Sequence, residues 1–271
     1  MIKNIIFFFV FFFFSDFLKS QSNYHDFATD ENICRYLIGD DVNIRDIPST
    51  KGKIVSKLPI GSCVRILEKT DYTLTLKDFE SHWYKVSFGD FKNKNVGYVW
   101  GGMISYITSD ASNESRKGYN YHFGVHSVDY KHEFGNSGTF QIRVSKDNKQ
   151  LDKILTQENI SFTDSDWSLS SIGNKGLKNI DDILSVSIFE EKCDGANHGM
   201  IYLVSDGKLH FISDVGGSGY SDEWEETYII YPDDERGSPN TIIVVYEYYY
   251  MGKRDISFTK YRWNGSSLIE I

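Results

Sequence analysis

Proline and cysteine are scarce in this sequence, with four and three residues among 271, and long amphipathic helical patterns are few. Phenylalanine, tyrosine and glycine are abundant instead, at 19, 18 and 22 residues. Aromatic side chains suit the pleated, half-buried surface of a sheet, and glycine suits the turns between strands. The composition therefore favours strands and turns over long helices, arranged in one large or two modest domains.

Common catalytic signatures are also missing. The sequence contains no HExxH zinc motif, no Gly-x-Ser-x-Gly nucleophile turn and no phosphate-binding loop. Cys193 follows a strand-like segment, whereas a catalytic thiolate is typically stabilised where a helix begins. His122, His126 and His132 cluster, but without a helical pattern they are better explained as surface or hydrogen-bonded side chains. We expect no enzyme, unless folding brings Cys193 to a histidine or the first two histidines to a third metal ligand.

One long apolar run lies at the N-terminus, from Ile5 to Phe14, shortly after Lys3. It is too short to cross about 30 Å of hydrocarbon as a helix, but it fits the apolar region of a secretory signal peptide. Residues 20–22, Ser-Gln-Ser, have the small-x-small form of a cleavage site. We therefore predict a signal peptide over residues 1–22 and no membrane span after its removal. An uncleaved N-terminal anchor is the alternative.

The three cysteines are Cys34, Cys63 and Cys193. Export to an oxidising compartment would permit a disulfide, and an odd number allows at most one bridge within the chain. Cys34 and Cys63 could pair, which would leave Cys193 free. Equally, all three could be ordinary buried apolar residues.

Charge and composition divide the chain near residue 108. Residues 108–118, TSDASNESRKG, form a polar, serine-rich interval without apolar periodicity, as expected of a linker. Before it, residues 33–107 carry a small excess of basic side chains, whereas residues 119–271 are strongly acidic. The acidic half argues against a nucleic-acid partner, because affinity for phosphates depends on Lys and Arg.

The second half alternates apolar and polar residues in many short segments, which predicts an antiparallel β domain. The expected strands are 121–130, 139–145, 183–191, 200–205, 209–214, 227–232, 241–250, 256–263 and 267–271. Asp206-Gly207, Met251-Gly252 and Asn264-Gly265 stand between such runs and suit tight hairpins. These hairpins could build a sandwich, a barrel or a propeller-like meander, and the sequence leaves that choice open.

Residues 33–107 show a more particular pattern. Four segments follow one another in order: VNIRDIPS (42–49), IVSKLPIGSCVRILE (54–68), WYKV (83–86) and VGYV (96–99). Together they resemble the bacterial SH3 (SH3b) family, although Ile47 stands where that family commonly has Gly before Pro. The resemblance implies a small, strongly bent barrel of five or six strands, followed here by the acidic β domain, in an all-β protein.

The resemblance also separates barrel-core residues from candidate ligand contacts. The residues expected in the core are Ile44, Val55, Leu58, Val64, Ile66, Val86 and Val99, because alternate strand residues face the same side. Aromatic side chains offer a large contact area at low entropic cost. The candidate ligand face therefore comprises Tyr36, Tyr72, Tyr84, Tyr98 and Trp100.

Binding rather than catalysis is what this resemblance implies. Bacterial SH3 domains are common in exported proteins, where several recognise the peptide part of peptidoglycan and others mediate protein contacts. We expect an exported protein of the bacterial envelope, periplasmic, surface-exposed or secreted, whose partner is a peptidoglycan stem peptide or an envelope protein. The alternatives are a cell-wall hydrolase with its site in the second domain, and a purely structural protein.

An acidic stretch in the second half, residues 214–225, deserves comparison with a calcium loop. Asp214, Ser218, Asp222 and Glu225 occupy places 1, 5, 9 and 12 of an EF-hand pattern. Gly216 at the third place brings no side-chain oxygen, and the flanking segments look like strands rather than helices. We expect a solvated acidic loop and no cofactor, with an irregular Ca²⁺ site as the alternative.

Overall fold

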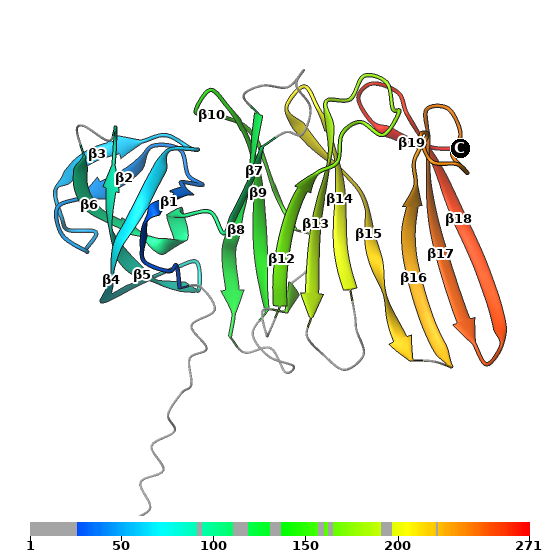
Figure 1. Ribbon diagram of the computed structural model, residues 1–271, viewed down its shortest axis with the longest axis horizontal. Coiled ribbons are helices and arrows are strands. Elements are labelled where there is room, and N and C mark those ends of the chain that lie inside the picture. Colours follow the sequence, from blue (N-terminus) through cyan, green and yellow to red (C-terminus); the bar gives the residue numbers. More distant parts are fainter. Residues whose placement is uncertain are drawn as a thin grey trace, which may run out of the picture.

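The structure is a computed structural model, and it describes residues 26–90, 94–110, 119–130, 137–156, 160–161, 165–190, 197–220 and 222–271. Within these ranges the protein is nearly all β, in three antiparallel sheets. The helical content of the described residues is one 3-10 turn, η1 (Gly101–Met103). The molecule is elongated, with a small barrel at one end and the last strands at the other (Figure 1). These observations confirm the all-β prediction.

The first sheet curls into the small barrel. Its strands are β1 (Asp30–Tyr36), β2 (Val42–Arg45), β3 (Ile54–Leu58), β4 (Cys63–Leu76), β5 (Phe79–Phe88) and β6 (Asn95–Trp100). They pair in the order β1-β4-β5-β6-β2-β3. Two register irregularities between the long strands β4 and β5 bend this pair, because a bulge kinks the strand that carries it and increases its twist. A disulfide joins Cys34 on β1 to Cys63 on β4, which is one of the two alternatives that the sequence leaves open, while Cys193 lies outside the described residues.

Most of the expected barrel core is buried. Five of the seven predicted residues are fully buried, namely Ile44, Val64, Ile66, Val86 and Val99, and Leu58 packs partly buried against them. Val55 is the exception, because its side chain is 48% exposed. It faces the register irregularity between Ile44 and Arg45, where regular alternation does not predict the inward face. The prediction that Val55 fills the core is wrong.

The second sheet follows directly. It consists of β7 (Ile107–Asp110), β8 (Tyr119–Asp129), β9 (Ser137–Lys146) and β10 (Lys149–Leu155) in the order β10-β9-β8-β7, with β11 (Ile160–Ser161) paired to β9. Residues 108–110, which the sequence assigns to a linker, are therefore part of a strand. The rest of that interval, residues 111–118, lies outside the described residues.

The third sheet is an eight-stranded meander whose strands pair in chain order. They are β12 (Ser165–Ser171), β13 (Asp182–Glu190), β14 (Asn197–Ser205), β15 (Lys208–Tyr220), β16 (Glu223–Ile230), β17 (Thr241–Tyr250), β18 (Lys253–Trp263) and β19 (Leu268–Glu270). Asp206-Gly207 and Met251-Gly252 form two of its turns with positive φ, as tight hairpins require. This sheet is therefore a meander of successive antiparallel strands.

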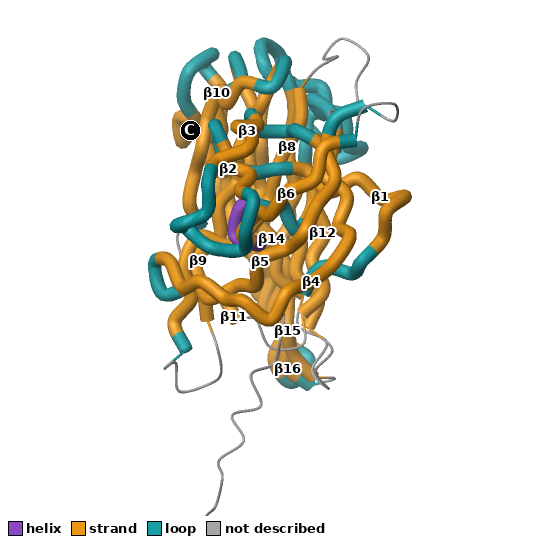
Figure 2. Tube along the Cα trace, turned by 90° about the vertical axis from the view of Figure 1, so that its left-hand side faces the viewer, coloured by secondary structure: helices purple, strands orange, loops and turns teal. Residues whose placement is uncertain are grey.

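One apolar core connects the barrel to both larger sheets. Phe79, Trp83 and Trp100 of the barrel belong to the same buried cluster as Phe123 of β8 and Tyr202 of β14. Seen from the barrel end, the strands of the larger sheets run behind the barrel (Figure 2). The barrel thus keeps a core of its own around Ile44, Ile66 and Val99, and the shared cluster packs the barrel against the larger sheets.

The far end of the meander is less covered. A second cluster packs Leu177 and Ile180 against β13–β15 and the beginning of β17. Beyond it, Tyr220, Tyr250 and Phe258 on the hairpins β15–β16 and β17–β18 are exposed. These hairpins thus present accessible side chains at the end of the molecule opposite the barrel (Figure 1).

Candidate functional site

Two of the five aromatic residues predicted as a ligand face are buried. The Tyr84 hydroxyl donates to Asp26 Oδ1 and accepts from the Phe27 backbone N–H, both at 3.2 Å, and burial raises the pKa of this tyrosine. Trp100 Nε1 donates to the carbonyl oxygens of Leu74, at 2.9 Å, and Ser81, at 3.1 Å. Both side chains are satisfied within the protein interior, so neither can belong to an exposed ligand face.

The other three aromatic residues do not converge. Tyr98 is partly buried against the shared core. Tyr36 and Tyr72 are 38% and 65% exposed, but Tyr36 pairs with Cys63 at the beginning of β4, whereas Tyr72 lies nine residues further along that strand. The barrel therefore presents isolated exposed tyrosines rather than an aromatic surface.

Among the described residues, the two histidines on β8 are not gathered with other possible metal ligands. His122 is fully buried, with Nε2 at 2.8 Å from Ser145 Oγ, and burial, followed by the charge of Arg143, lowers its pKa to about 4. His126 Nε2 lies 3.5 Å from the Lys77 ammonium group. His132 lies outside the described residues. Within the described ranges, no group of three or more His, Cys, Asp or Glu side chains could hold a metal ion.

Three of the four predicted calcium ligands lie on the paired strands β15 and β16, and Asp222 lies in the turn between them. Asp214, Ser218 and Glu225 line a polar hollow of about 290 Å³, together with His198 and Tyr246, whereas Asp222 is not part of its lining. Glu225 accepts a hydrogen bond of 2.9 Å from the Tyr246 hydroxyl, and His198 Nε2 is 3.8 Å from Asp214 Oδ1. The Asp214 and Glu225 carboxylates thus both have neighbouring side chains as partners.

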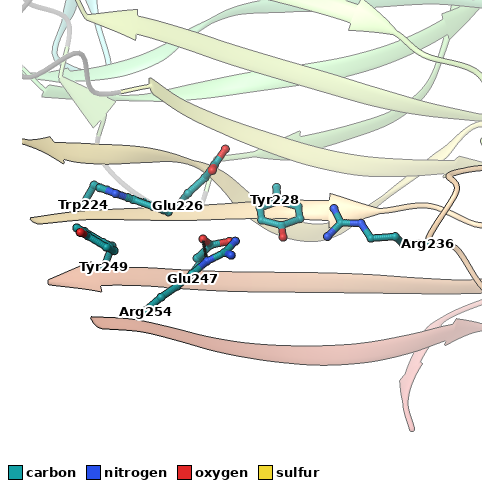
Figure 3. A pocket seen from close by; sticks show the side chains of 7 residues that line it. All are labelled: Trp224, Glu226, Tyr228, Arg236, Glu247, Tyr249 and Arg254. Carbon is teal, nitrogen blue, oxygen red and sulfur yellow. Dashed lines mark hydrogen bonds and ion pairs between the residues drawn. The ribbon is translucent and has the colours of Figure 1, made fainter. Parts of the chain in front are cut away.

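An open hollow of about 660 Å³ lies on the far hairpins (Figure 3). It is lined by Trp224, Glu226, Tyr228, Arg236, Glu247, Tyr249 and Arg254. Strand register brings most of them to one face, because directly opposed residues of antiparallel strands share a face. Trp224 pairs with Tyr249, which in turn pairs with Arg254. We refer to this set of seven residues as the aromatic hollow.

Aromatic rings occupy both ends of the hollow. The rings of Trp224 and Tyr249 stack with centroids 5.7 Å apart and planes 13° apart. At the other end, the Arg236 guanidinium lies 5.6 Å from the centre of the Tyr228 ring, a cation–π arrangement. Figure 3 shows Glu226, Glu247 and Arg254 between these two ends. A ligand in the hollow would meet apolar ring surface and charge together.

Glycines of β15 keep one side of the hollow open. Gly219 pairs with Trp224, and Gly217 pairs with Glu226. A Cβ atom on Gly219 would approach the Glu223 carbonyl oxygen to 2.3 Å, and its φ of +144° is one that L residues rarely adopt. The strand therefore requires glycine there and adds no side chain beside the indole.

The charged groups of the hollow differ in how they are paired. Arg254 forms an ion pair with Glu247, and this hydrogen bond lowers the pKa of Glu247. Glu226 is exposed and, within the described part of the chain, has no hydrogen-bond or ion-pair partner. The lining includes no Ser, Cys or His. The arrangement can bind a small organic ligand that has an apolar surface and charges of both signs.

Sequence reasoning did not find this hollow. The signal that could have indicated it is the alternation of Trp224, Glu226 and Tyr228 along β16, facing Glu247 and Tyr249 on β17. That alternation places each set on one face of its own strand. Only the register between the two strands shows that the two sets share one face.

The barrel has the strand number and bent geometry of a small SH3-like domain. Residues 40–105 match the family model described as bacterial SH3 domain, which confirms the resemblance drawn from the four sequence segments. Comparisons with curated proteins and with solved structures give no match. No helix in the described ranges has the length and apolarity needed to cross a membrane.

Proposed function

We propose that the protein is an exported, non-catalytic binding protein of the bacterial cell envelope, whose ligand is a peptide or a peptidoglycan fragment. The match to the bacterial SH3 family supports a wall-related binding role, since these domains are often extracellular or associated with the cell wall. The N-terminal apolar run supports export. The Cys34–Cys63 disulfide suits an oxidising compartment.

The observation that carries the proposal is the aromatic hollow. Peptidoglycan stem peptides carry carboxylates, and many carry a free ammonium group. In the hollow, the carboxylate of Glu226 would accept from an ammonium group, and the Arg236 guanidinium would bind a carboxylate. The stacked Trp224 and Tyr249 rings supply apolar area at low entropic cost. Tyr36 and Tyr72 of the barrel remain predicted ligand contacts at a second, separate site.

Sedimentation with purified, insoluble peptidoglycan tests this proposal on the full chain from residue 23. Trp224→Ala should reduce retention by roughly tenfold in apparent affinity, as expected of a central aromatic contact. Tyr250→Ala is the matched control, because it removes an exposed aromatic ring from the opposite face of the neighbouring strand β17. This control should retain the affinity of the unmodified chain, and Tyr72→Ala reports on the barrel.

Three outcomes would contradict the proposal. Absence of retention by the unmodified chain would exclude a wall ligand. Retention that depends on Tyr72 but not on Trp224 would move the site to the barrel. Release of soluble fragments during long incubation would show a hydrolase instead of a binding protein.

A further inference from the structure

The outer edge of β18 lacks a neighbouring strand over most of its length. On its inner side, β18 pairs with β17 from Lys253 to Arg262. On its outer side, β19 pairs only with residues 261–263, and the Ile271 N–H adds one bond of 3.0 Å to the Lys260 carbonyl. Within the described chain, residues 253–259 thus form a sheet edge.

The backbone groups available along this edge follow from the strand geometry. In an antiparallel ladder, alternate residues direct both their N–H and their C=O to the same neighbour. The Lys260 carbonyl points outward, because it accepts from Ile271, and the pairing with β17 is free of register irregularities. Every second residue before Lys260 has the same orientation, so Arg254, Ile256 and Phe258 also direct their backbone N–H and C=O outward. These are the groups that an added strand would use.

Side chains along the same edge are unusual for an unpaired strand. Ile256 and Phe258 are 52% and 62% exposed, and both line a second, more apolar hollow of about 400 Å³ on this face. Arg254 and Lys260 flank them two residues away on each side, and the Lys260 ammonium lies 5.3 Å from the centre of the Phe258 ring. Proteins normally keep exposed apolar side chains off such edges, because they invite pairing. From Arg254 to Lys260, the side chains on this face are therefore basic, apolar, apolar and basic.

We propose that this edge binds an extended segment of a partner protein by strand addition, and that the segment alternates acidic, apolar, apolar and acidic residues on the face it shares with β18. Main-chain hydrogen bonds to Arg254, Ile256 and Phe258 supply affinity, and alternate side chains supply specificity. Opposite charges on neighbouring strands are favourable, whereas like charges are not. One acidic residue of the segment would lie across from Arg254. The other would meet the Lys260 ammonium group, which lies over the Phe258 ring, because Ile271 occupies the position directly across from Lys260. Because the pattern is symmetric, it fits a parallel or an antiparallel partner.

The same pattern disfavours a second copy of this chain as the partner. Antiparallel pairing of two β18 edges about their apolar centre would bring Arg254 towards Lys260 at both ends, where Ile271 already occupies the position across from Lys260. Parallel pairing in register would place each basic residue next to its own copy. Like charges at these distances repel. Pairing between the β18 edges of two copies is therefore unfavourable, and a partner strand with acidic residues is favoured.

A fluorescent peptide, Ser-Glu-Thr-Val-Thr-Val-Thr-Glu-Ser, tests the proposal by anisotropy titration of the full chain at low salt. We expect saturable binding that weakens by roughly tenfold or more when both Glu residues are replaced by Lys. N-methylation of the two Val amides should weaken binding similarly if the peptide pairs antiparallel, and N-methylation of the Thr amides beside them should do so if it pairs parallel. Equal binding of the Lys peptide would overturn the charge match. Strand addition would be overturned if neither N-methylated peptide bound more weakly than the unmethylated peptide, or if no binding occurred at millimolar peptide.

Two protein variants make the test specific. Lys260→Glu should weaken binding of the Glu peptide and strengthen binding of the Lys peptide, an exchange that loss of folding cannot produce. Ser257→Thr, which points to the opposite face of β18, should leave binding unchanged. Trp224→Ala should also leave it unchanged, and this separates the edge from the aromatic hollow. Loss of peptide binding in Trp224→Ala alone would assign the peptide to the hollow and overturn the proposal.

Discussion

Acid should destabilise this fold through His122. The ring is fully buried, and its two nitrogens face the hydroxyl groups of Ser145, at 2.8 Å, and Thr108, at 3.3 Å. Burial and the nearby Arg143 lower the pKa from 6.5 to about 4. Because the unfolded chain binds this proton more readily than the folded chain, stability that is present at pH 7 is lost as the pH falls below about 6.5.

The magnitude follows from the two pKa values. The difference between 6.5 and about 4 corresponds to a loss of about 3 kcal/mol once the pH is below both values. At pH 5 the unfolded histidine is almost fully protonated while the folded one is still mostly neutral. Most of the loss, about 2 kcal/mol, should therefore appear between pH 7 and pH 5.

Urea unfolding at pH 7, 6 and 5 measures this loss. His122→Gln keeps a hydrogen-bonding side chain but removes the titrating group, so its free energy of unfolding should fall by about 2 kcal/mol less over this range than that of the unmodified chain. His126→Gln is the control, because that ring is less buried and should contribute less. Identical pH dependence in the unmodified chain and in His122→Gln would refute the argument.

Three further changes should affect stability. Replacing Cys34 and Cys63 by Ser opens a bridge with a sequence separation of 29 and should cost about 3.5 kcal/mol in urea unfolding; an unchanged midpoint would contradict the bridge. Asp182→Ala removes a buried carboxylate that accepts from the Tyr121 hydroxyl at 2.9 Å and should lower stability by about 3 kcal/mol, measured the same way against Asp182→Asn. Gly219→Ala forces a Cβ against backbone and should cost about 1–3 kcal/mol, with altered near-ultraviolet circular dichroism of the indole beside it; native behaviour would disprove the clash.

Local patterns were sufficient to predict the barrel and most strands of the meander. Apolar alternation and Asp-Gly or Met-Gly turns are local signals, and the structure confirms the strands that they indicate, from β8 to β19. Strands β7, β10, β11 and β12 were missed. KQLDKIL in β10 carries a register irregularity, and SDWSLSS in β12 is serine-rich and stands at the edge of its sheet. Neither segment shows the clean alternation of a half-buried strand.

Long-range packing explains what the sequence could not show. Tyr84 is covered by Phe27, whose ring lies 5.5 Å away in an edge-on contact, and Trp100 belongs to the core shared with the larger sheets. Alternation predicts that such residues share a face, but not what covers that face. The aromatic hollow depends likewise on the register between β16 and β17.

The most direct test of the central claim is an isothermal titration of a soluble peptidoglycan fragment, a disaccharide bearing its stem peptide, into the full chain from residue 23. The account predicts saturable binding that is weakened by roughly tenfold in Trp224→Ala and unchanged in Tyr250→Ala. Absence of binding to the unmodified chain, or equal affinity of Trp224→Ala, would contradict a wall-derived ligand in the aromatic hollow.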